Sequence, residues 1–78
     1  RKAQERELKQ VEKKLQELES QVTRQVRAVE EMNAKVNAEA TPSLTAIAEL
    51  NAAQTLLHQL EEQWMEAAER KQWVENKR

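Results

Sequence analysis

Several residue types are missing from this sequence, and each absence removes a class of function. There is no glycine, cysteine, aspartate, phenylalanine or tyrosine. Phosphate-binding loops need glycine, because their backbone takes positive φ angles or approaches the ligand closely. Without cysteine there is no disulfide, thiolate zinc site or thiol nucleophile, and without aspartate there is no Ser-His-Asp triad. No apolar run reaches the ~18 residues of a membrane-spanning helix, so we expect a soluble chain with no membrane partner.

The residues that are present indicate one small helical domain. The chain has 78 residues, of which 38% are apolar and 35% are charged. The 13 basic and 14 acidic side chains give a formal net charge of −1. Such a balance predicts no overall attraction to nucleic acid or to membranes. Any binding of a polyanion therefore has to come from the way the charges are distributed.

The apolar residues of the first half follow an alternating spacing of three and four, which is the heptad pattern of a coiled coil. Nearly all other residues there are good helix formers, so we predict a helix over about residues 1–38. Leu8 takes heptad position a, and glutamines occupy two d positions, at Gln4 and Gln25. The apolar seam positions are Leu8, Val11, Leu15, Leu18, Val22, Val29, Met32 and Val36.

The pattern breaks at residues 37–43 (NAEATPS), and we predict a turn over about 39–42. Pro42 disfavours a helical conformation at Thr41 but suits the first position of a new helix, with Thr41 as its N-cap. Ser43 is the competing cap. The second helix is then expected over about 43–78, with Lys71 as a polar interruption of a seam that contains Leu50, Ala53, Leu57, Leu60, Trp64, Ala67 and Val74.

The two seams match each other when the chain folds back on itself. In an antiparallel hairpin the residue numbers of facing core positions have a constant sum, and here that sum is 82. Large residues then often face small ones, as Val29 faces Ala53 and Leu15 faces Ala67. The fold class is therefore all-α, a two-helix antiparallel coiled-coil hairpin. Because the heptads begin and end without caps, we expect residues 1–78 to be a single module of a longer chain.

The charges are segregated between the faces of this predicted hairpin. One flank carries glutamates at e positions of both helices, namely Glu5, Glu12, Glu19, Glu61 and Glu75. The outward side of the first helix is basic, and further bases gather at the open end. As candidate nucleic-acid contacts we predict Lys2, Arg6, Lys9, Lys13, Arg24 and Arg27, with Arg70 and Lys71 at the open end beside Arg1, Lys77 and Arg78. A basic stripe can follow a phosphate backbone. The alternative is a solvated face with i to i+4 pairs such as Glu5 with Lys9, Glu31 with Lys35 and Glu66 with Arg70.

No residue is expected to act in catalysis, bind a cofactor or hold a metal. His58 is the single histidine and lacks a second strong metal ligand. Two helices also offer no pocket in which a carboxylate can be desolvated for acid–base work. Trp64 falls at a seam position and is predicted to be core, whereas Met65 and Trp73 fall outside it and are candidates for protein docking. Val26, Ile47 and Leu56 lie beside the seam, where they can either extend the core or accept a further helix; we expect the first.

Two segments resemble the C-terminal extension of the ABC-F ATPases, duplicated ATP-binding proteins that act on the ribosome. Residues 5–19 (ERELKQVEKKLQELE) are similar to the charged opening helix of that extension. In that helix an Arg-Glu-Leu element leads into Leu-Glu heptads. Residues 57–67 (LHQLEEQWMEA) are similar to its closing run into a tryptophan. The resemblance implies a cytoplasmic module that contacts ribosomal RNA or DNA and is appended to ATPase domains outside this chain. The module itself carries no nucleotide-binding motif.

Two other interpretations stay open. The hairpin can be a structural stalk or a protein-interaction coiled coil with no nucleic-acid role, docking through Trp73, Met65 and Leu56. It can also be a coiled coil that associates with copies of itself. The constant sum of 82 favours an intramolecular fold, so we expect a monomeric hairpin.

Overall fold

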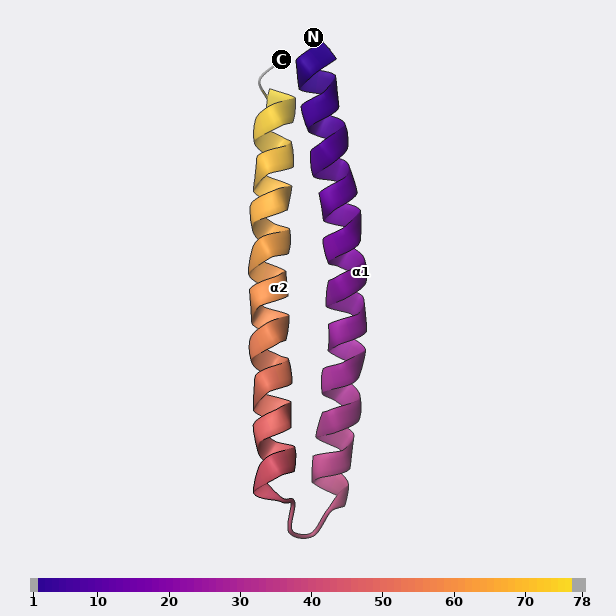
Figure 1. Ribbon diagram of the computed structural model, residues 1–78, viewed down its shortest axis with the longest axis vertical. Helices are drawn as coiled ribbons and strands as arrows, with labels where there is room; N and C mark the ends of the chain where they lie inside the picture. Colours follow the sequence, from indigo (N-terminus) through magenta and orange to yellow (C-terminus); the bar gives the residue numbers. More distant parts are fainter. Residues whose placement is uncertain (1, 77–78) are drawn as a thin grey trace.

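A computed structural model describes residues 2–76 and places them in two helices, α1 (Lys2–Ala38) and α2 (Leu44–Asn76). The helices lie side by side and run in opposite directions, with both ends of the chain at one end of the rod and the turn at the other (Figure 1). The rod measures 60 × 14 × 14 Å. The prediction of an all-α, two-helix antiparallel hairpin is confirmed.

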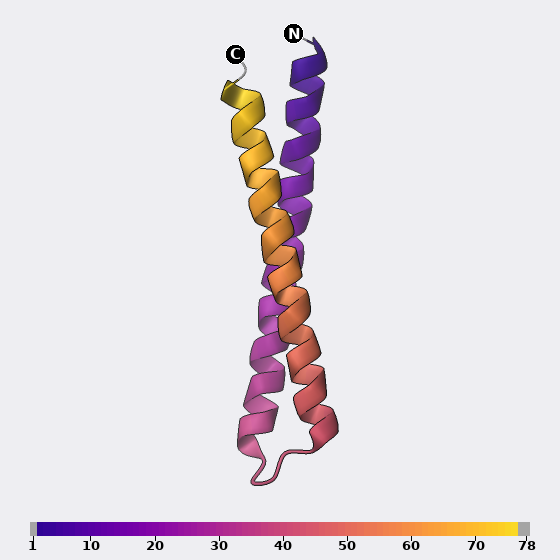
Figure 2. The ribbon, with the colours of Figure 1, turned by 90° about the vertical axis from the view of Figure 1, so that its left-hand side faces the viewer.

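The predicted heptad seam forms the contact between the helices. Leu18 and Val74 are each 1% exposed, and Leu50 and Ala53 are also buried. The other apolar seam residues are half-buried, with Trp64 as the exception. A seam that repeats every seven residues drifts around a straight helix, so two such helices must cross at a shallow angle to stay in contact. Figure 2 shows this crossing.

Two glutamines of the seam make the same contact three heptads apart. The Gln25 side-chain amide donates to the carbonyl oxygen of Ala53 at 2.9 Å, and the Gln4 amide donates to that of Val74 at 3.2 Å. The predicted facing residue of Gln25 was Leu57, one turn further along α2. A helical carbonyl points toward the amide four residues on, so Gln25 sits between Ala53 and Leu57. The repeated contact gives the two helices one preferred register.

The turn spans residues 39–43 and is capped by Ser43. The backbone amide of Ala46 donates to the Ser43 hydroxyl at 3.1 Å, and the amide of Ile47 donates to the Ser43 carbonyl at 3.1 Å. The prediction of Thr41 as the cap was wrong, because serine is the stronger N-cap and α2 starts only at Leu44. At the other side of the turn the Glu39 amide donates to the Val36 carbonyl. No described residue has a positive φ angle, in keeping with a turn built without glycine.

Neither helix is long and apolar enough, over the residues that the structure describes, to cross a membrane.

Candidate functional site

Six basic side chains form a stripe along the outward side of α1, and all six are exposed. With 3.6 residues per turn they fall within an arc of about 60°, centred opposite the seam. Four of them lie in the first third of α1, and two follow after a gap of about 16 Å, at 1.5 Å per residue. We call this surface the basic stripe; its members are Lys2, Arg6, Lys9, Lys13, Arg24 and Arg27.

No side chain of the basic stripe forms an ion pair with a glutamate among residues 2–76. Among residues 2–76 the ion pairs are Arg70 with Glu7 and Lys71 with Glu75, the latter at 3.8 Å. The i to i+4 pairs that the alternative interpretation needs, including Glu5 with Lys9, are not formed within the described part of the chain. Within the stripe, Arg24 Nε donates to the backbone carbonyl of Ser20 at 3.4 Å. Exposed pairs are worth about 0–1 kcal/mol, so little holds such side chains together in water.

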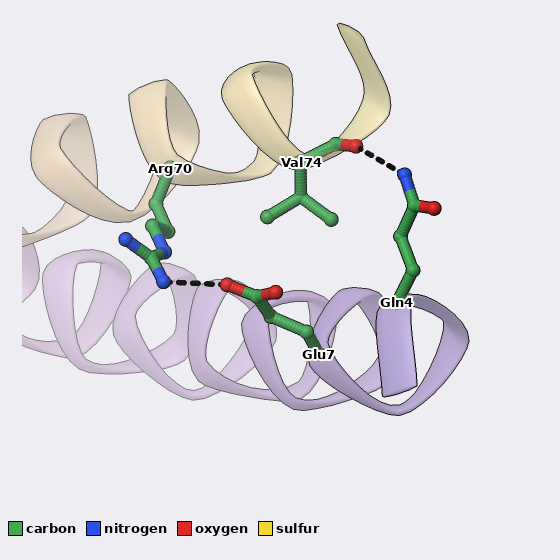
Figure 3. Close-up of polar contacts among 4 residues, drawn as sticks. All are labelled: Gln4, Glu7, Arg70 and Val74. Atoms are coloured by element: carbon green, nitrogen blue, oxygen red, sulfur yellow. Dashed lines mark hydrogen bonds and ion pairs between the residues drawn. The ribbon is translucent and has the colours of Figure 1, made fainter. Parts of the chain in front are cut away.

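Arg70 and Lys71, the other two predicted nucleic-acid contacts, are turned toward acidic partners. Arg70 reaches across to Glu7 of α1, next to the contact between Gln4 and Val74 (Figure 3). Its guanidinium also lies 5.0 Å from the centre of the Trp73 ring. Lys71 is half-buried at the seam and pairs with Glu75 one turn on. The structure therefore does not bring these two bases together with the stripe, and Arg1, Lys77 and Arg78 lie outside the described residues.

The two predicted docking residues, Met65 and Trp73, do not share a surface. Both are exposed, at 55% and 51%. With Trp64 at position a, Met65 falls at b and Trp73 at c, which point to opposite flanks of α2. Trp73 lies on the flank that is spanned by Arg70 and Glu7. Met65 lies on the other flank, beside the acidic residues.

An open groove runs along this acidic flank, next to Trp64. A hollow of about 270 Å³ is lined by Glu19, Val22, Thr23, Glu61, Trp64 and Met65. A second hollow of about 540 Å³ shares Glu19 and Trp64 and continues to Glu12 and Lys71. We call the two together the Trp64 groove.

Sequence reasoning missed this groove because it placed Trp64 in the core. The indole is in fact 36% exposed. Val26, Ile47 and Leu56 were likewise expected to extend the core, and all three remain exposed. With only two helices, nothing covers the outer edge of an e or g position. One feature of the sequence pointed to the groove, namely the e-position glutamates of both helices beside Trp64, the largest residue of the seam.

The structure offers no metal site among the residues that it describes. No three histidine or glutamate side chains there come together as ligands, and His58 is exposed. Comparison of the chain with protein-family models, with curated proteins and with solved structures finds no match. The resemblance to the ABC-F extension thus stays a prediction from the residue pattern, and the function has to be argued from the surfaces of the hairpin.

Proposed function

We propose that this hairpin is a non-catalytic module that contacts nucleic acid, either ribosomal RNA or DNA, through the basic stripe of α1. The observation that carries the proposal is the stripe itself, six exposed basic side chains on one face with no ion-pair partner among the described residues. The resemblance to the ABC-F extension points the same way and suggests that the module ends an ABC-F type ATPase.

The spacing of the stripe suits a phosphate backbone. Lys2, Arg6, Lys9 and Lys13 recur every three or four residues, which places a cation about every 5 Å along the helix. Each phosphate that is neutralised releases counterions, and this release supplies most of the binding energy that does not depend on base sequence. The stripe contains no aromatic residue on which a base can stack. We therefore expect contacts to the backbone, with little base preference.

Salt titration of binding tests this proposal. The 78-residue chain is titrated with duplex DNA and with a ribosomal RNA fragment, and the affinity is measured against salt concentration. The test variant is Lys9→Gln/Lys13→Gln, and the matched control is Lys14→Gln/Lys35→Gln, which removes the same charge from two g positions of α1 that lie outside the basic stripe. We expect the test variant to lower the slope of log K against log salt by about 1.4 to 1.8, and the control to leave it unchanged.

Two results would count against the proposal. One is an absence of binding at low ionic strength, and the other is an equal loss of slope in both variants, which would indicate attraction to overall charge. Circular dichroism of each variant shows whether the helices are intact.

A second candidate function is a structural stalk or protein-interaction coiled coil. The 60 Å rod and the open Trp64 groove favour it. It predicts that changes at the groove alter partner binding while the basic stripe is dispensable.

A further inference from the structure

The Trp64 groove exposes apolar surface beside Leu18, which is one of the two most deeply buried residues of the seam. Leu18, which was predicted to face Trp64, is 1% exposed, whereas the indole is 36% exposed. Part of Trp64 therefore reaches the flank, where it lines both hollows. Val22 and Met65 line the smaller hollow together with Trp64, so the floor of that hollow is apolar. A contiguous apolar floor with a polar rim is typical of a protein-binding surface.

The rim of the groove is acidic, and its charges oppose each other. Glu19 of α1 and Glu61 of α2 line one hollow, and no basic residue lines it with them. Arg24 shares a separate hollow with Glu19 on the outward side of α1. Glu12 extends the rim, where the basic residue of the second hollow is Lys71, already paired with Glu75. Two like charges that line the same hollow repel each other. A cationic occupant would relieve that repulsion and gain Coulomb energy.

The acidic rim and the apolar floor decide which of three molecules can occupy the groove: nucleic acid, a second copy of this chain, or a helix of another protein. Nucleic acid is repelled by the acidic rim. A second copy that presents the same flank would set its own Glu19 and Glu61 against the first. A second copy that presents its basic stripe would bring cations but no apolar anchor, since the other positions between Lys13 and Arg27 on that face are Gln16, Glu17, Ser20 and Thr23. A basic amphipathic helix from another protein offers apolar side chains to the floor and cations to the rim.

We propose that the Trp64 groove is a docking site for a basic amphipathic helix of a partner protein. A large apolar side chain of the partner fills the hollow between Val22, Trp64 and Met65. Lysine or arginine residues one turn away pair with Glu19 and Glu61. From Glu12 to Thr23 the groove extends about 16 Å, which is the length of three helical turns. Recognition of a helix by its apolar face in this manner is a recurring mode of peptide binding. The proposal does not depend on the nucleic-acid function, because it uses a different face and the opposite charge.

Fluorescence of Trp64 tests the proposal directly. The chain's two aromatic residues are Trp64 and Trp73, so a Trp73→Phe background leaves Trp64 as the only fluorophore. The probe is a synthetic Leu–Lys amphipathic helix of about 14 residues, enough to cover the groove at 1.5 Å per residue. A Leu–Glu peptide of the same pattern is the charge control. We expect the Leu–Lys peptide to shift the Trp64 emission to shorter wavelength in a saturable manner, and the Leu–Glu peptide to leave it unchanged.

Variants separate this site from general charge attraction. Glu19→Gln/Glu61→Gln should weaken binding of the Leu–Lys peptide about tenfold, as two charge pairs near the surface predict. The matched control Glu17→Gln/Glu69→Gln removes the same charge from exposed positions outside the groove and should have little effect. Met65→Ala, at an exposed position that folding does not need, should weaken binding severalfold.

Four outcomes would overturn the proposal: no saturable shift with the Leu–Lys peptide, equal binding of the Leu–Glu peptide, equal losses in the two glutamate variants, or a Trp64 shift that depends on the concentration of the chain alone. The last result, with a rising mass in sedimentation, would assign the groove to a second copy.

Discussion

The two tryptophans of α2 lie on opposite flanks of the hairpin and have neighbours of opposite charge. On one flank the guanidinium of Arg70 lies over one face of the Trp73 ring, which stays 51% exposed, and Arg70 in turn pairs with Glu7 across the helices. On the other flank Trp64 stands beside Glu19 and Glu61, and no cation of residues 2–76 is found over its ring. Both tryptophans are partly exposed, and the flanks differ in their charges. On the first, which we call the closed flank, Arg70 and Glu7 bridge the two helices, and on the second, which we call the open flank, Glu19 and Glu61 line a hollow with no such bridge.

This difference indicates where the molecule can accept a partner. The Trp73 ring already has a cation over one face, so a cation from another protein adds little there. At Trp64, which lies between like charges, a cationic partner adds both apolar burial and charge neutralisation. The open flank is thus the better candidate for protein docking, while the basic stripe of α1, which belongs to neither flank, is the candidate for nucleic acid.

The largest expected effect lies in the seam that both flanks share. Leu18→Ala should lower the free energy of unfolding by about 3 kcal/mol, because the side chain is fully buried and its loss leaves a cavity. Urea denaturation followed by circular dichroism measures the change. Leu44→Ala is the control, since Leu44 is 86% exposed and its loss should cost less than about 0.5 kcal/mol. Equal costs in the two variants would mean that the helices do not pack at the predicted layer.

The next largest effect is the difference in stability between variants of the two tryptophans. Trp64→Ala should lower the free energy of unfolding by about 2 kcal/mol, because much of the indole fills the seam. Trp73→Ala should cost less than about 1 kcal/mol, which is the value of an exposed cation–π contact with a small amount of packing. The same denaturation experiment measures both. A larger cost for Trp73 would show that the closed flank, and not the seam, holds this end of the hairpin together.

The smallest effect comes from placing a base on the open flank. Glu61→Lys sets a lysine opposite Glu19 and should raise the free energy of unfolding by a few tenths of a kcal/mol at low salt, with the gain lost at high salt. Thermal unfolding at two salt concentrations measures it. Glu69→Lys makes the same change of charge at an exposed position away from the groove. If both variants are stabilised equally, the repulsion between Glu19 and Glu61 contributes nothing.

Much of the fold could be predicted because helix periodicity and turn chemistry are local. The spacing of Leu8 to Val36 predicted the seam of α1, and Pro42 predicted the turn to within one residue. The choice between Thr41 and Ser43 as cap was less certain, since two adequate caps differ by only a few tenths of a kcal/mol. The separation of Met65 from Trp73 was also visible in their heptad positions, b and c, although the two were assigned to one docking role.

Contacts between the helices could not be predicted in the same way. Glu66 and Glu7 are both within reach of the long Arg70 side chain, and exposed pairs of this kind differ little in energy. The structure shows the pair with Glu7, because α1 and α2 come close enough at that layer for Arg70 to reach across while it lies over Trp73.

By itself, the sequence determined two uninterrupted helices, their seam and the place of the turn, because heptad spacing and the absence of glycine act along the chain. Only the tertiary structure decided that Trp64 extends beyond its layer, that Arg70 closes one flank and that Glu19 and Glu61 line a groove on the other. These features depend on the distance between two facing helices and on the volume of each layer, and neither quantity is encoded by the spacing of residues within one helix.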